Sequence, residues 1–437
     1  MEREALEQLI AWKERENRKP LIVRGARQVG KTWLMLEFAQ KAFANYVYIN
    51  FEEDELLQHL FENDFNIERI ISTISLRTQV DIDSSTLIIF DELQAAPRGI
   101  VALKYFYEKA PHYPVMAAGS LLGLAMHPGE SFPVGKVDFV SLYPMNFKEF
   151  LMATGHASLI APIQKGDWTT VRFVKDKLIA LLRTYYYVGG MPEAVLSYCE
   201  RKNLNEVRRI QENILLTYEN DFSKHAPMAE VPRIRMVWHS IMGQLAKENR
   251  KFIYGMLRQG ARSKDYEVAI EWLRDAGLVY QVSRTKSGEL PLSAFEDYGS
   301  FKLFMLDVGL MSAMNKISSE MLIAGNELFT SYRGTLTEQY VCQQLQGEAD
   351  FIYYWSADNS RGEIDFLIQQ KDRVIPIEVK AEENLRAKSL AAFVAKYPSL
   401  HALRFSMSDY RDQDWMTNIP LYALFRWRFE KYQNVTY

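Results

Sequence analysis

Eight residues near the start of the sequence, GARQVGKT (Gly25 to Thr32), have types and spacing that could bind phosphate. The pattern G-x-x-x-x-G-K-T lets successive backbone N–H groups surround phosphate oxygens at a helix amino terminus, where the dipole favours negative charge. Lys31 is expected to reach the β- and γ-phosphates of ATP, and the Thr32 hydroxyl to ligate Mg²⁺. The residues expected to contact the nucleotide are Gly25, Ala26, Arg27, Gln28, Val29, Gly30, Lys31, Thr32 and Trp33.

The segment TLIIFDE (Thr86–Glu92) supplies the acidic groups that such a loop needs. Asp91 stands at the end of an apolar, strand-like run, where a carboxylate can hold Mg²⁺, and Glu92 is placed to orient or deprotonate the attacking water. Ser120 ends the later run VMAAGS. It is a candidate sensor of the γ-phosphate, and alternatively it caps the helix that LLGLAM predicts.

A second set of residues near the carboxyl terminus could hold another metal ion. Residues two apart on a strand share a face, so Glu378 and Lys380 in DRVIPIEVKAE should point the same way. Asp365 in GEIDFLIQQ can lie opposite Glu378 on a paired strand, and the two carboxylates suit Mg²⁺. Lys380 would polarise the attacking water and Glu338, on a preceding helix, would orient a second ion or water. Alternatively, these are ordinary solvated charges on a hairpin.

A trans-acting arginine is not identified by the sequence. Arg27 lies inside the loop, Arg98 follows the segment DELQAAP, and Lys136 precedes the fifth strand-like run. Lys cannot make the bidentate contact that an arginine makes, which weakens the role of Lys136. For each of the three, the favoured interpretation is a solvated surface charge.

Strands and helices must position the first set of residues. Apolar, β-rich runs alternate with helical patterns, which indicates a parallel sheet buried on both faces. The predicted strands are Leu21–Gly25, Tyr46–Glu52, Thr86–Glu92, Val115–Ser120 and Lys136–Pro144.

The order of these motifs resembles a family of bacterial and archaeal AAA+-type P-loop ATPases. The segments that carry the resemblance include IVRGARQVGKT, LIIFDELQ, VSLYPMNFKEFL, YYYVGGMPEAV and FKLFMLDVGLM, over about residues 20 to 435. The family implies ATP-dependent work by a ring-shaped homo-oligomer, such as a hexamer. Its carboxyl-terminal domain of unknown function is related to restriction endonucleases, and Glu338, Asp365, Glu378 and Lys380 match the PD-(D/E)xK pattern of that nuclease fold.

The expected fold class is therefore α/β: a P-loop AAA+ ATPase core with a helical lid, a winged-helix module and a PD-(D/E)xK nuclease-like α/β domain. The predicted bounds are 1–145, 146–228, 229–300 and 301–437. The helical segment from Asn146 to Ser223 is either an AAA+ lid or a plain connector.

The winged-helix prediction rests on residues 231–285, which indicate three helices followed by a strand. A basic stretch within it could contact DNA. Acidic side chains on the last of these helices oppose that use, so protein contact is the alternative. The basic residues are Arg250, Lys251, Arg258, Arg262 and Lys264, and the acidic ones are Glu267, Glu271 and Asp275.

Composition narrows the class of protein. The chain has 437 residues, 48% of them apolar and 24% charged, with a formal net charge of −3. Two cysteines exclude a disulfide framework, and the charged amino terminus is not a signal peptide. We expect a cytoplasmic protein without membrane segments, since no apolar run has the length of a spanning helix.

Three functions stay open on the sequence alone, the narrowest of which is an Mg²⁺-dependent nuclease whose activity ATP merely gates. The first is an ATPase acting on DNA, including branched DNA such as a four-way (Holliday) junction, with a nuclease-like domain that binds or cuts it. The second is a nucleotide-controlled switch acting on proteins, with an inactive nuclease-like domain. The net charge of −3 favours the second slightly, because surfaces that neutralise phosphate are rich in Lys and Arg.

Overall fold

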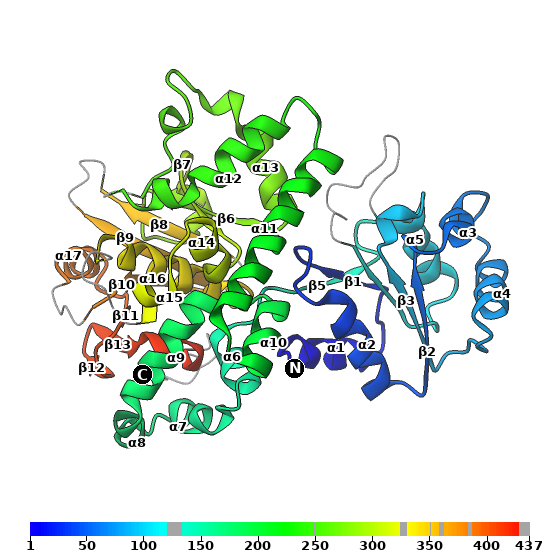
Figure 1. Ribbon diagram of the computed structural model, residues 1–437, viewed down its shortest axis with the longest axis horizontal. Helices are drawn as coiled ribbons and strands as arrows, with labels where there is room; N and C mark the ends of the chain where they lie inside the picture. The colour runs from blue at the N-terminus through cyan, green and yellow to red at the C-terminus, as the bar shows by residue number, and fades with distance from the viewer. Residues whose placement is uncertain are drawn as a thin grey trace. The chain divides into compact units, whose positions relative to one another are not determined.

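The computed structural model divides the chain into two compact units (Figure 1). The first is Met1–Tyr143 with Asp275–Gly277, and the second is Pro144–Arg274 with Leu278–Tyr437. The structure describes residues 1–119, 133–247, 250–323, 330–349, 351–357, 362–382 and 387–427, with the backbone alone at 323, 330 and 331. Ser120, the candidate γ-phosphate sensor, lies outside the described residues.

The first unit contains a five-stranded sheet in which every neighbouring pair is parallel, in the order β2-β3-β4-β1-β5. The predicted parallel sheet is therefore confirmed, with β4 between the strand that enters the phosphate loop and the strand that ends in the acidic pair. The strands are β1 (Leu21–Arg24), β2 (Asn45–Asn50), β3 (Thr86–Asp91), β4 (Val115–Ala118) and β5 (Asp138–Ser141).

Helices bury both faces of this sheet. Ile88 and Phe90 of β3 belong to a core that the apolar sides of α4 and α5 complete. Leu87 and Ile89 alternate with them and are also fully buried, so the other face is covered as well. The helices are α1 (Ala5–Lys13), α2 (Lys31–Ala42), α3 (Glu55–Gln58), α4 (Ile67–Thr78) and α5 (Gly99–Lys109).

The second unit is built on an eight-stranded mixed sheet in the order β12-β13-β11-β10-β9-β8-β6-β7. β7 crosses residue 300, so segments on both sides of that predicted boundary share one sheet. The four-domain division stays a prediction. The strands are β6 (Val279–Thr285), β7 (Glu296–Met305), β8 (Ile352–Ser356), β9 (Glu363–Gln370), β10 (Arg373–Val379), β11 (Ala402–Ser406), β12 (Arg411–Gln413) and β13 (Met416–Pro420).

The helical segment predicted after residue 146 is confirmed. It comprises α6 (Phe147–Ala153), α7 (Ile160–Lys165), α8 (Trp168–Phe173), α9 (Lys175–Val188), α10 (Pro192–Arg201) and α11 (Leu204–His225). Later helices are α12 (Val231–Leu245), α13 (Glu267–Asp275), α14 (Val308–Met314), α15 (Ser319–Ile323), α16 (Thr330–Leu345) and α17 (Lys388–Lys396). Of the described helices, none has both the length and the apolar composition to cross a membrane.

One expectation for the winged-helix region is wrong. Between α12 and α13 we expected a further helix, but the chain forms two short 3₁₀ turns, Tyr254–Met256 and Ser263–Asp265. Gly255 and Gly260 lie in this stretch, and glycine costs about 1 kcal/mol in a helix interior relative to alanine. Gly260 also adopts a φ of +78°, which a helix does not accommodate. The winged-helix assignment is left with two α-helices and the β6–β7 hairpin.

A buried polar network ties the helical layer of the second unit to α14 and α16. The Asp307 carboxylate, fully buried, accepts hydrogen bonds from the backbone N–H of Gly190 (2.6 Å) and Leu310 (2.9 Å) and from the Gln343 amide (3.0 Å). Burial raises the pKa of Asp307, and these hydrogen bonds oppose the rise. A Cβ on Gly189 would lie 2.1 Å from the carboxylate. The two glycines of YYYVGGMPEAV therefore have a structural explanation: Gly189 leaves room for the Asp307 carboxylate, and Gly190 donates a hydrogen bond to it.

Candidate functional site

The loop between β1 and α2 has a backbone that its sequence specifies. A Cβ on Gly25 would lie 2.2 Å from the carbonyl oxygen of Leu142, so no larger residue fits. Gly30 has a φ of +93° at the amino-terminal cap of α2, and Gln28 has a φ of +66°. These left-handed positions curl the loop around the start of the helix, as phosphate binding requires.

Lys31 lies across this loop. Its side chain is buried, and Nζ donates hydrogen bonds to the carbonyl oxygens of Gly25 and Ala26, both at 2.9 Å. Burial lowers the pKa of Lys31 to about 8, while the nearby carboxylates of Glu92 and Asp91 oppose that shift. The ammonium group is therefore held in place where phosphate oxygens would lie along the loop.

Thr32 and Asp91 meet although 59 residues separate them in the sequence. The Thr32 hydroxyl donates to Asp91 Oδ2 at 2.5 Å, and the Tyr48 hydroxyl donates to the same oxygen at 3.1 Å. Burial raises the pKa of Asp91, and the Thr32 hydrogen bond opposes the rise. A hydroxyl and a carboxylate at this separation are the oxygen ligands that Mg²⁺ prefers. Sequence reasoning missed Tyr48, whose signal was its place in the strand that pairs with β3.

Glu92 is held in a conformation that non-glycine residues rarely adopt. Its φ is +48°, and its carboxylate accepts a hydrogen bond from the Gln94 amide at 2.6 Å. Such backbone strain costs of order 1–3 kcal/mol and is concentrated at functional sites. Glu92 also donates its backbone N–H to Asp91 at 3.0 Å, so the two acidic side chains are fixed relative to each other.

Arg3, in the amino-terminal segment, contacts the phosphate loop and stabilises it. Its guanidinium is buried and donates to the carbonyl oxygens of Val29 (2.9 Å) and Tyr143 (2.6 Å). Sequence reasoning read this segment only as a charged end. A single arginine gives no pattern from which such a contact could be predicted.

Of the candidates for a trans-acting residue, Arg98 and Lys136 have contacts within the first unit. Arg98 stacks over the Phe65 ring at 4.2 Å, and Lys136 forms an ion pair with Glu108 at 3.1 Å. Arg27 is half-buried in the loop. These contacts do not test a role in trans. Trp33, at the start of α2, is 41% exposed, so its ring faces outward from the loop.

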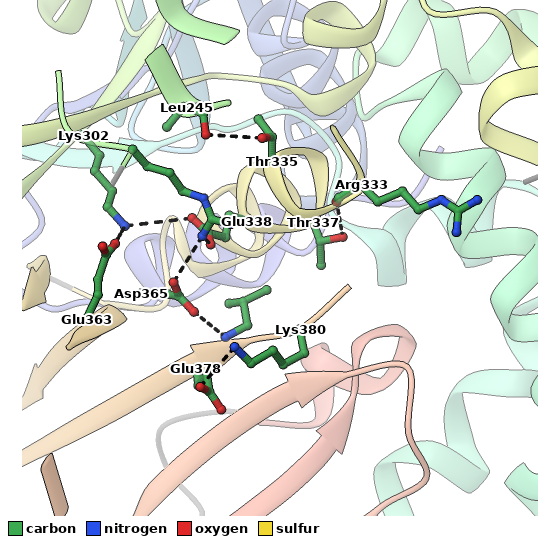
Figure 2. Close-up of polar contacts among 12 residues, drawn as sticks. Leu245, Lys302, Arg333, Thr335, Thr337, Glu338, Glu363, Asp365, Glu378 and Lys380 are labelled. Carbon is green, nitrogen blue, oxygen red and sulfur yellow. Dashed lines mark hydrogen bonds and ion pairs between the residues drawn. The ribbon is translucent and has the colours of Figure 1, made fainter. Parts of the chain in front are cut away.

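The second predicted set also meets in space (Figure 2). In the antiparallel β9–β10 register, Phe366 pairs with Ile377. Continuing this register by one residue places Asp365 opposite Glu378. Asp365 Oδ2 accepts the backbone N–H of Val379 at 2.7 Å. The ammonium group of Lys380 lies 3.2 Å from Glu378 Oε1.

Glu378 is a buried carboxyl in a mixed field. Burial raises its pKa, the Lys380 ammonium lowers it, and Asp365 raises it again. Glu338 on α16 is 2% exposed and belongs to the same cluster. Both carboxylate oxygens of Glu338 and Oε2 of Glu378 are buried without a hydrogen bond among the described residues, which is costly unless positive charge lies nearby.

Two basic residues that sequence reasoning did not place here bring positive charge to Glu338. Arg250 forms ion pairs with Glu338 and, at 3.4 Å, with Asp365. Lys302, fully buried on β7, forms an ion pair with Glu363 and lies 4.0 Å from Glu338 Oε2. The result is an alternating chain of charges, and Figure 2 shows Lys302 between the two glutamates.

The donor set of this cluster suits a divalent ion only in part. Asp365 and Glu378 are two adjacent oxygen ligands, which Mg²⁺ can use together with water. Within the described ranges, no group of three or more His, Cys, Asp or Glu side chains could hold a metal ion. The guanidinium of Arg250 instead occupies one face of Asp365 and Glu338.

The basic stretch after Arg250 is solvent-facing. Arg258, Arg262 and Lys264 are exposed, and they lie in the 3₁₀-turn region before α13. Glu267 and Glu271 on α13 are exposed too, so that helix presents negative charge. A phosphate-binding surface in this region would therefore use the loops and not α13.

The comparisons with known proteins agree with the geometry of the first unit. Residues 17–151 match the family model of an AAA domain. The first unit is an AAA-type P-loop domain. Residues 179–321 and 333–424 match two domains of unknown function, DUF8612 and DUF4143. These two matches give no activity for the second unit.

Solved structures that resemble this chain include P-loop ATPases. A Walker-type ATPase of Pyrococcus abyssi is 14% identical, with 71% of this chain and 95% of that chain covered and a TM-score of 0.46. The Aeropyrum pernix Orc1 protein in complex with DNA is 12% identical, covering 73% and 91%, with a TM-score of 0.28. The Thermotoga maritima RuvB Holliday junction branch migration motor is 13% identical, covering 67% and 91%, with a TM-score of 0.30. At these scores the likeness carries no argument about function. No curated protein matches the chain.

Proposed function

We propose that the chain is an ATP-hydrolysing AAA+ ATPase that couples nucleotide turnover to a nucleic-acid site in its second unit. The observation that carries the ATPase part is the meeting of Lys31, Thr32 and Asp91 at the carboxyl ends of β1 and β3. Two oxygen ligands for a metal and a cation for phosphate arise there from segments that are distant in the sequence.

Each residue of this site has a role in the proposed reaction. The backbone N–H groups from Gln28 to Thr32 surround the phosphates, and Lys31 neutralises their oxygens. Thr32 and Asp91 would hold Mg²⁺, which when bound offsets charge on the phosphates during transfer. Glu92, fixed by Gln94, orients the attacking water and accepts its proton.

For the second unit we propose a PD-(D/E)xK nuclease-like domain that binds DNA and, with Mg²⁺, cleaves it. The juxtaposition of Asp365, Glu378 and Lys380 supports this role, because two carboxylates and an ammonium group converge at one strand end. Asp365 and Glu378 would hold Mg²⁺, Lys380 would polarise the attacking water, and Glu338 would orient a second ion or water. Branched DNA such as a Holliday junction is the substrate class we include in the proposal.

The remaining parts of the proposal concern assembly. Helices α6 to α11 would act as the AAA+ lid, and the region of α12, α13 and the β6–β7 hairpin as a winged-helix-like module. The active species would be a homo-oligomeric ring, such as a hexamer, in the cytoplasm.

A specific observation favours a second function. Arg250 and Lys302 already neutralise the carboxylates of the second site from within the chain. If that arrangement is permanent, the nuclease-like domain is inactive, and the chain is a nucleotide-controlled switch acting on protein partners. The net charge of −3 agrees with this alternative.

Steady-state ATP hydrolysis distinguishes the two functions. Turnover is measured without DNA and with single strands, duplex or a four-way junction, each at low and moderate salt. Stimulation by one DNA form, weakening as salt rises, is the result expected for a DNA-acting ATPase. Turnover indifferent to every DNA form would favour the protein-directed switch, and absence of turnover under all conditions would contradict the ATPase assignment.

A further inference from the structure

We propose that Arg250 is a built-in counter-ion that keeps divalent metal out of the carboxylate cluster until DNA phosphate draws it away. This inference rests on the proposed nucleic-acid function of the second unit and adds its regulation. In this proposal, the position of Arg250 determines whether the carboxylate cluster is neutralised by the guanidinium or binds a metal ion.

Arg250 contacts both Glu338 and Asp365, and these carboxylates lie on different elements, α16 and β9. Its side chain is 27% exposed, whereas those of Glu338 and Asp365 are 2% and 12% exposed. The guanidinium is therefore the most solvent-exposed of these three charged groups.

Arg250 competes electrostatically with a divalent metal ion for the same carboxylates. A guanidinium and a divalent cation bind the same carboxylate oxygens, and a buried carboxylate supports few positive neighbours at once. Lys302 neutralises Glu363 and lies near Glu338, so the cluster needs one further cation for Asp365 and Glu338. In this structure Arg250 supplies it, and the entry of a metal ion requires its withdrawal.

The backbone holds Arg250 in an unusual conformation. The residue has a φ of +49°, in a region that non-glycine residues rarely adopt. The chain just beyond it is anchored, because Phe252 donates its backbone N–H to Phe301 at 2.8 Å and Ile253 exchanges two hydrogen bonds with Gln244. These hydrogen bonds anchor the segment to β7 and α12, while the Arg250 guanidinium reaches the carboxylates of Glu338 and Asp365.

A bound DNA phosphate would withdraw Arg250 from the carboxylates. Arg250 begins the basic stretch that continues with the exposed residues Arg258, Arg262 and Lys264. In the described part of the chain, no carboxylate forms an ion pair with Arg258 or Lys264. A DNA phosphate bound along this stretch would offer Arg250 an alternative anionic partner, since a guanidinium binds phosphate as well as carboxylate. DNA binding and metal binding then favour each other.

The test is Mn²⁺ binding to the full chain without ATP, with and without a short duplex whose phosphorothioate linkages resist hydrolysis. Without DNA, the wild-type chain should bind Mn²⁺ weakly, and with DNA its affinity for Mn²⁺ should rise roughly tenfold or more. By reciprocity, Mn²⁺ should raise the affinity for DNA by the same factor. Arg250→Ala should bind Mn²⁺ tightly without DNA, and DNA should add little. Arg209→Ala, which removes an exposed arginine of α11, should behave as wild type.

The contrary outcomes separate the two levels of the proposal. If Arg250→Ala and Arg250→Gln, both folded by circular dichroism, bind Mn²⁺ no better than wild type, Arg250 does not exclude metal. If these variants bind tightly but DNA leaves wild-type affinity unchanged, phosphate is not what withdraws Arg250. Asp365→Asn should abolish the Mn²⁺ binding that Arg250→Ala gains over wild type. If that gain persists, the ion binds elsewhere, and the nuclease-like assignment itself fails.

Discussion

The two candidate sites neutralise their buried charges in opposite ways. In the first unit, backbone carbonyls hold Lys31, and hydroxyls accompany Asp91. In the second unit, Asp365 and Glu338 contact the guanidinium of Arg250, and Glu363 contacts the ammonium group of Lys302. The first arrangement leaves the ammonium group of Lys31 to pair with a negatively charged ligand. In the second, cations of the chain itself already pair with the carboxylates. A motif can thus be complete in both sites while only one is ready for its ligand.

The largest expected effect separates the two sites by function. Lys31→Ala should lower ATP turnover by about 100-fold or more, because the γ-phosphate loses its cation at the moment charge develops on it. Binding of DNA to the second unit in the absence of ATP should persist. Measured turnover equal to wild type would contradict the assignment of the phosphate loop.

The buried lysines of the two sites, Lys31 and Lys302, should contribute differently to the free energy of unfolding. Lys302→Met should lower the free energy of unfolding by about 3 kcal/mol, because Glu363 and Glu338 lose a buried counter-charge. Lys31→Met should leave it unchanged or raise it, since burial already penalises the charged form of Lys31, as its lowered pKa indicates. Urea denaturation of nucleotide-free protein measures both. Equal losses in the two variants would mean that the first site is balanced in the same way as the second.

The pH dependence of ATP binding tests the first site alone. The pKa of Lys31 is about 8 without nucleotide, and bound phosphate must raise it. Below this pH the ammonium group is charged in both states and contributes no pH dependence. Above it, binding takes up a proton, so affinity should fall by up to about tenfold per pH unit. ATP dissociation constants from pH 7.5 to 9.5, as approximate bounds around that pKa, measure this.

The matched control for that titration is Lys31→Arg. A guanidinium stays protonated throughout this range, so its affinity should not depend on pH through this group. The same slope in both proteins would assign the effect to another residue.

The smallest expected effect concerns Lys136. Its ion pair with Glu108 joins two partly exposed side chains, so Lys136→Ala should change the free energy of unfolding by no more than about 0.5 kcal/mol. Turnover should also be unchanged. A strong loss of turnover in the assembled protein, with unaltered folding, would instead identify Lys136 as a residue that acts on a neighbouring subunit's nucleotide.

The sequence by itself determined the parts that local rules govern. The phosphate loop needs glycine at fixed positions because no Cβ fits at Gly25 and because Gly30 adopts a positive φ. Continuous apolar runs predicted the parallel sheet, since a strand buried on both faces cannot alternate. The register that brings Asp365 opposite Glu378 follows from the two-residue period of a strand, so the pairing of the second motif was also readable.

The tertiary structure decided which charges face those motifs. Arg3, Tyr48, Arg250 and Lys302 come from segments with no motif of their own, and only the folding of the chain brings them to Val29, Asp91, Glu338 and Glu363. Ion pairs between residues far apart in the sequence carry no local pattern, because their energy depends on burial and distance and not on spacing. For that reason the sequence named the carboxylates of the second site, and the fold revealed that the chain had already neutralised them.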